Sequence, residues 1–166
     1  MLNNNSMRIM TFTIIIVLVA IVAYAQDNNN LAYWTDSANK KINNLEIEKG
    51  QSILVRLKAE IPQNKILKAY SVIIYFDNSK ISVEANATPN SRIVPSNVSI
   101  EDSGAIIING FDVKGITGKS TASITDITIT GKETGDFPCS ILFTAFGEKS
   151  DDQFLPKGDY LTILVK

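Results

Sequence analysis

Residues 68–76 of the chain are KAYSVIIYF, and this stretch decides the fold class. Its aromatic and β-branched residues are the types that favour β-strands. The turn-forming residues Asp77, Asn78 and Ser79 follow directly and end the run. The stretch therefore predicts one short strand that is closed by a turn.

The same pattern of β-prone runs and turns extends outward from this strand. Further runs cover residues 45–48, 52–61, 81–85, 105–111, 122–130, 139–146 and 160–165, and residues 86–97 are predicted to form a long loop. No segment from Leu45 onward keeps the 3.6-residue apolar period of a helix. We therefore predict an all-β fold, a single β-sandwich with jelly-roll topology and about nine strands. Its predicted span is residues 45–166.

The N-terminus has the three parts of a secretory signal. Arg8 comes first, an apolar run follows at residues 9–22, and Ala23-Tyr24-Ala25 is a small-residue cleavage pattern. We predict that residues 1–25 are a signal segment and that the domain is secreted or lies at the cell surface. An uncleaved anchor is the alternative. Cleavage would leave no membrane span in the mature chain.

A polar segment connects this signal to the predicted sandwich. Residues 26–44 are rich in asparagine, and we predict that they form a tether outside the sandwich. Within it, Leu31, Tyr33 and Trp34 are candidates for a first short strand. Trp34 is the only tryptophan, and a packing role is expected for it rather than ligand binding.

The composition argues against catalysis and against nucleic acid. With 16 basic and 17 acidic side chains, the formal net charge is −1, which gives no reason to expect the basic face of a nucleic-acid-binding protein. The chain has no histidine and one cysteine, which excludes Ser-His-Asp and Cys-His catalysis and any metal site built on a cysteine cluster. Gly118-Lys119-Ser120 lacks the upstream glycine of a phosphate-binding loop and is predicted to be a turn. We predict no catalytic residue, no metal ligand and no cofactor.

The order and spacing of the runs carry a family resemblance. Residues 45–60, LEIEKGQSILVRLKAE, form a strand, a Lys-Gly turn and an alternating strand. Residues 61–85, IPQNKILKAYSVIIYFDNSKISVEA, add a loop, a strand, an aromatic-Asp turn and a further apolar run. With GAIIINGFDVKGITG at 104–118 and ITDITITGKETGD at 124–136, the chain resembles a cohesin domain. Cohesins are nine-stranded jelly-roll sandwiches that capture calcium-stabilised dockerin modules on one flat sheet face.

Strand alternation predicts which side chains would form such a face, because alternate residues of a sandwich strand point to the core and to the outside. We place these side chains inward: Tyr70, Val72, Ile74, Phe76, Thr125, Ile127, Ile129, Cys139, Ile141 and Phe143. The resemblance implies that their three strands lie in one sheet. The predicted partner-binding face is then Ser71, Ile73, Tyr75, Ile124, Asp126, Thr128, Leu142, Thr144 and Phe146. Tyr75 and Phe146 are its expected aromatic anchors. In the run 105–111, three consecutive isoleucines leave the orientation open.

Together with the signal segment, the resemblance implies a secreted, non-catalytic module that binds a protein. The partner is either a dockerin-like module, with any calcium on the partner, or another protein. Many cohesins carry an Asn-x-Asp pair where this chain has Ala69 and Ser71, which indicates a more apolar contact or a different partner. The main alternative is a carbohydrate-binding module that acts on extracellular polysaccharide. A third is a structural subunit of a cell-surface assembly, joined by strand addition at the last strand, residues 160–165.

Overall fold

The structure is a computed structural model that describes residues 27–86, 94–101 and 104–166. The described residues form twelve strands and include no helix that is long and apolar enough to cross a membrane. The strands are β1 (Asp27–Thr35), β2 (Lys41–Ile42), β3 (Asn44–Ile47), β4 (Ser52–Ile61), β5 (Ile66–Tyr75), β6 (Ile81–Asn86), β7 (Val94–Glu101), β8 (Ala105–Thr117), β9 (Ser120–Gly131), β10 (Gly135–Gly147), β11 (Pro156–Gly158) and β12 (Leu161–Val165).

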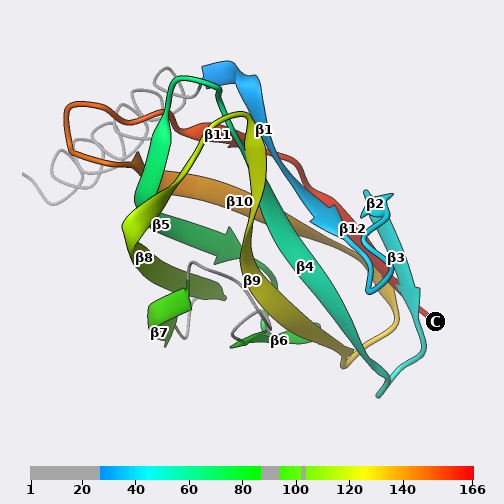
Figure 1. The fold of residues 1–166 in the computed structure, drawn as a ribbon. Helices are drawn as coiled ribbons and strands as arrows, with labels where there is room; N and C mark the ends of the chain where they lie inside the picture. The colour runs from blue at the N-terminus through cyan, green and yellow to red at the C-terminus, as the bar shows by residue number, and fades with distance from the viewer. Residues whose placement is uncertain (1–26, 87–93, 102–103) are drawn as a thin grey trace, which may run out of the picture.

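These strands form two sheets that stack as a sandwich. One sheet has the order β11-β1-β4-β9-β6, with β2 paired to β1, and the other has the order β3-β12-β10-β5-β8-β7. Figure 1 shows β4 and β9 in one layer and β5 and β8 in the other. The β1–β11 and β3–β12 pairs are parallel, whereas all other strand pairs are antiparallel.

The predicted all-β sandwich is confirmed, with more strands than expected. Three short or irregular segments account for the difference: β2, β11 and β7, which begins inside the predicted loop 86–97. Pro95 and the polar residues around it conceal β7 in the sequence, because proline is rare within strands except at sheet edges. The predicted signal segment, residues 1–25, lies outside the described residues.

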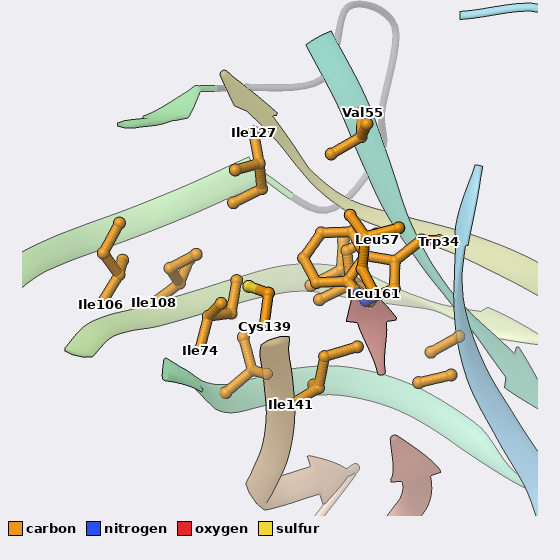
Figure 2. Packing of buried hydrophobic residues seen from close by; sticks show 14 of the residues in the cluster. Trp34, Val55, Leu57, Ile74, Ile106, Ile108, Ile127, Cys139, Ile141 and Leu161 are labelled. Atoms are coloured by element: carbon orange, nitrogen blue, oxygen red, sulfur yellow. The ribbon is translucent and has the colours of Figure 1, made fainter. Parts of the chain in front are cut away.

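The core fills the space between the sheets and is built from alternate residues of each strand. All ten side chains that were predicted to point inward are buried, from Tyr70 on β5 to Phe143 on β10. Figure 2 shows Trp34 and Leu57 from the first sheet and Leu161 from the second among the side chains of one buried cluster. Burial of this continuous apolar cluster supplies the main force that holds the two sheets together.

Strand β1 belongs to the sandwich, which corrects the predicted domain boundary at Leu45. Its residues 32–35 pair in register with β4, and its N-terminal part pairs with β11. Ala32 and Trp34 are fully buried in the core. The asparagines before Leu31 conceal this strand in the sequence, since asparagine is depleted in strands. Residues 27–44 are therefore part of the domain rather than a tether.

Tyr70 makes a polar contact between the two sheets. Its hydroxyl donates a hydrogen bond of 2.9 Å to the backbone carbonyl of Ile124 on β9, and burial raises the pKa of Tyr70 above its ordinary value. Gly110 lies directly opposite Tyr70 on β8. A Cβ atom at Gly110 would lie 2.4 Å from Cε1 of the Tyr70 ring, so only glycine fits beneath this ring.

Gly110→Ala is therefore expected to lower the free energy of unfolding by about 1–3 kcal/mol, the usual cost of overpacking a core. Urea unfolding measures this change. The same substitution in a Tyr70→Ala background should cost clearly less, because the ring that it strikes is gone. Equal costs in the two backgrounds would contradict the steric explanation.

Candidate functional site

The nine predicted binding residues do not share one face, because their strands lie in different sheets. Strands β5 and β10 are direct neighbours. Strand β9 instead lies between β4 and β6 in the opposite sheet. The prediction is therefore wrong for Ile124, Asp126 and Thr128, which cannot join β5 and β10 in one surface.

The structure gives two of these β9 residues structural roles. Ile124 is fully buried, because it is the extra residue at a register shift between Thr125 and Ser123. Asp126 is 2% exposed, and its carboxylate accepts hydrogen bonds from Nε and Nη2 of Arg56 at 2.6 and 3.0 Å. The hydrogen bonds to Asp126, and then the negative charge of its carboxylate, raise the pKa of the Arg56 guanidinium. Such a forked ion pair fixes β4 against β9.

Phe146 is also buried rather than exposed, and a β-bulge is the reason. The register between β10 and β5 shifts between Phe143 and Ala145, so one residue is added and the alternation reverses. Phe146 therefore points into the core with no exposed surface. Its ring packs edge-on against Phe143 and Phe154, with ring centroids 5.1 and 5.0 Å apart.

The other five predicted residues do lie together on the outside of the second sheet. Tyr75 is 43% exposed, and Thr144 is also exposed. Ser71, Ile73 and Leu142 are half-buried. Ile73 and Leu142 are direct cross-strand partners, so their side chains project to the same side.

Strand β8 adds three residues that the sequence did not assign. Ile106 and Ile108 are fully buried, so alternation turns Ile107, Asn109 and Phe111 outward. In register, Ile107 is opposite Ile73, Asn109 is opposite Ser71, and Phe111 is opposite Ala69. Three consecutive isoleucines concealed this orientation in the sequence, and the burial of Ile106 and Ile108 resolves it.

We call the resulting surface the β10–β5–β8 face. It consists of Ser140, Leu142 and Thr144 on β10, Ser71, Ile73 and Tyr75 on β5, and Ile107, Asn109 and Phe111 on β8. Leu142, Ile73 and Ile107 form an apolar row across its middle. Tyr75 lies on one side of this row, and Phe111, which is 57% exposed, lies on the other. None of the nine residues carries a charge.

A hollow and two ion pairs border one end of the β10–β5–β8 face. The hollow has a volume of about 170 Å³, and its lining includes Ala69, Ala145 and Gly147. Lys68 bonds Glu148 at 2.6 Å, and Lys65 bonds Asp152, so the segment that follows β10 is held against β5. The face therefore ends at a small hollow that is bordered partly by this segment, from Glu148 to Gln153.

The described residues contain no group of three or more histidine, cysteine or acidic side chains that could hold a metal ion. Cys139 is buried, and burial raises the pKa of Cys139 to about 12. Its thiol stays protonated at neutral pH, so it is a poor nucleophile. Gly118, which has a φ of 79°, occupies the turn between β8 and β9, where the sequence predicted a turn rather than a phosphate site.

Strand addition at the last strand, residues 160–165, is contradicted by the sheet order. β12 lies between β3 and β10, and both of its edges are paired. The backbone groups that an added strand needs are therefore already used. The outer strands of the second sheet are β3 and β7.

Comparisons with known proteins identify the fold. No family model and no curated protein matches the chain. Among solved structures, the OlpA cohesin of Clostridium thermocellum, solved as a cohesin–dockerin complex, is 16% identical with a TM-score of 0.60 over 82% of this chain and 99% of that one.

Two further solved structures agree. A non-cellulosomal cohesin from Archaeoglobus fulgidus is 15% identical with a TM-score of 0.59, covering 82% of this chain and 91% of that one. A cohesin module of a family 33 glycoside hydrolase from Clostridium perfringens has a TM-score of 0.61 at 8% identity, covering 82% and 96% of the two chains. The sandwich described above therefore has a cohesin-like fold.

Proposed function

We propose that this protein is a secreted, non-catalytic module that binds another protein through the β10–β5–β8 face. The observation that carries the proposal is the composition of that face. A row of half-buried aliphatic side chains, Leu142, Ile73 and Ile107, lies between two exposed aromatic rings on a sheet surface without charges. An uncharged centre with aromatic anchors is typical of protein–protein interfaces.

The cohesin-like fold supports the same function and points to a dockerin-like partner. The OlpA cohesin, which shares the fold, was solved bound to a dockerin. In the family, one sheet face captures the partner, and we infer that the corresponding surface here is the β10–β5–β8 face. Ala69 and Ser71 replace the polar pair of many cohesins, so we expect a contact with fewer hydrogen bonds and more apolar packing.

Capture of secreted and envelope proteins of the source organism, with Ca²⁺ and with chelator, tests this proposal. The Tyr75→Asp variant should lose capture, because it replaces an exposed aromatic anchor by a charge beside the apolar row of the face. Leu54→Asp is the matched control, since Leu54 is 41% exposed but lies on β4, in the other sheet.

A captured dockerin-bearing protein that needs Ca²⁺, and that is lost only with Tyr75→Asp, would support the proposal. Calcium-independent capture on the same face would keep a protein partner but not a dockerin. Capture that survives Tyr75→Asp would show that the face is wrong.

Polysaccharide binding is the second candidate, because the face exposes the two aromatic rings of Tyr75 and Phe111. The only tryptophan, Trp34, is fully buried and cannot stack on sugar rings. If no protein is captured, binding on a glycan array that Tyr75→Ala and Phe111→Ala both abolish would support this second function.

The secretion part of the proposal rests on the N-terminal sequence. We expect the exported protein to begin at Gln26, because Ala23-Tyr24-Ala25 is the cleavage pattern of a signal peptide. Mass spectrometry of the protein from the culture medium measures its N-terminus. Recovery of the intact N-terminus from the membrane fraction would indicate an uncleaved anchor instead.

A further inference from the structure

Strand β7 is an open edge of the second sheet. It is the outermost strand, pairs with β8, and has no other partner strand among the described residues. Figure 1 shows it at the outer end of the layer that contains β5 and β8. An edge strand presents a row of backbone donors and acceptors to any extended strand that approaches.

The open part of β7 is short and has definite ends. Pro95 has no backbone N–H, and the register with β8 shifts between Pro95 and Asn97. From residue 97 to residue 101 the pairing with β8 is continuous. The midpoint of this stretch is Ser99. Residues 97–101 contain no lysine or arginine, the side chains that commonly prevent an edge strand from pairing with another chain. Glu101, at one end, is the only charged residue of this stretch.

Two apolar side chains extend from this stretch. Val98 is 40% exposed and Ile100 is 61% exposed. Val98 lies opposite Ile108 of β8, and Ile100 lies opposite Ile106. Both isoleucines are fully buried, so Val98 and Ile100 point to the core side of the sheet, although they lie beyond the edge of the core and remain exposed. The other outer strands, β3, β6 and β11, expose no large apolar side chain. Among these outer strands of the described part of the chain, the open edge and the exposed apolar side chains therefore coincide on β7.

We propose that a second copy of this chain pairs antiparallel along β7, about a two-fold axis through Ser99. In that register Val98 is opposite Ile100 of the other copy, and the reverse also holds. Each Glu101 is opposite an Asn97, whose amide can donate to the carboxylate, so no like charges meet. A two-fold axis centred on Val98 would instead place Glu101 opposite Pro95 and lose a backbone donor.

This dimer extends one sheet across both copies. A two-fold axis centred on a residue pairs side chains that point to the same side, as in any antiparallel ladder. The β10–β5–β8 faces of the two copies then lie on the same side of the shared sheet. The pair would be bivalent, and a partner with two binding segments would gain avidity from it.

Cysteine substitutions test the register of the two β7 strands. They are made in the full-length gene, and the protein is purified in the form that the cell produces. The two copies of a Ser99→Cys variant would place their cysteines directly opposite, within about 4.5–5.5 Å between Cα atoms. Asn97→Cys is the matched control, because its two copies would be four residues out of register, or roughly 13 Å apart along the strand. The native Cys139 is buried, so it does not form disulfides that compete with the introduced cysteine. Only Ser99→Cys is expected to oxidise to a covalent dimer.

Light scattering of the unmodified protein gives the second measurement. Because the ladder is short, we expect the measured mass to rise toward twice the monomer mass with increasing concentration. Ile100→Lys should remove this rise, and Leu54→Lys, on the other sheet, should not. Tyr75→Asp should leave the dimer intact, which separates this test from that of partner binding. A constant monomer mass, or equal oxidation of Ser99→Cys and Asn97→Cys, would overturn the proposal.

Discussion

Phe146→Ala is expected to lower the free energy of unfolding by about 3–5 kcal/mol, because it empties a fully enclosed aromatic site in the core. Phe146 has no exposed surface and packs edge-on against Phe143 and Phe154. The backbone N–H of Phe154 also donates to the carbonyl of Phe146 at 2.9 Å. The loss of the ring therefore weakens both β10 and the segment that returns toward β11. Urea unfolding, followed by the change in fluorescence of Trp34, measures the effect.

Tyr75→Ala is the control for this substitution, because it removes an aromatic ring from the β10–β5–β8 face instead of the core. Surface changes of this kind usually stay within about 0.5 kcal/mol. The two variants should thus separate stability from binding: the first destabilises the fold, and the second abolishes partner capture in a folded protein. Comparable stability losses in both variants would contradict the assignment of Phe146 to the core.

A chain that begins at Leu45 is expected not to fold cooperatively. It lacks β1, so the pairing of residues 32–35 with β4 is lost and Trp34 leaves an empty site in the core. β11 would also lose its pairing with β1. We expect no sigmoidal urea transition for this chain, whereas a chain that begins at Gln26 should show one.

The single substitution Trp34→Ala separates the two contributions of β1. It keeps the backbone pairing and removes only the side chain, at an expected cost of about 3–5 kcal/mol. Circular dichroism during thermal unfolding measures both effects. A cooperative transition in the chain that begins at Leu45 would show that the sandwich starts there after all.

Local alternation explains why much of the fold could be predicted from the sequence. On β5 and at the residue that follows it, alternation predicted the inward side correctly from Tyr70 to Phe76. On β10 the same rule was correct up to Phe143 and wrong at Phe146. A bulge adds one residue there, and nothing in the local sequence marks its position.

The composition of the candidate site depends on contacts that the sequence does not contain. Which sheet holds β9 is decided by its pairing with β4 and β6, and alternation along one strand carries no information about its neighbours. Ile107 could be assigned to the face only through its cross-strand partner, Ile73. Strands were therefore predictable one at a time, whereas the surface that they form together was not.

The parallel pair of β3 and β12 gives the domain a direction in which it resists mechanical tension. β3 and β12 pair at four positions, from Asn44 with Thr162 to Ile47 with Val165. In a parallel pair, a pull on the start of β3 and on the end of β12 acts in opposite directions along the strands. The hydrogen bonds of this pair are then stretched at the same time rather than opened one by one. A pull along this axis is therefore expected to separate β3 from β12 at a higher force than a pull that opens the pair one hydrogen bond at a time.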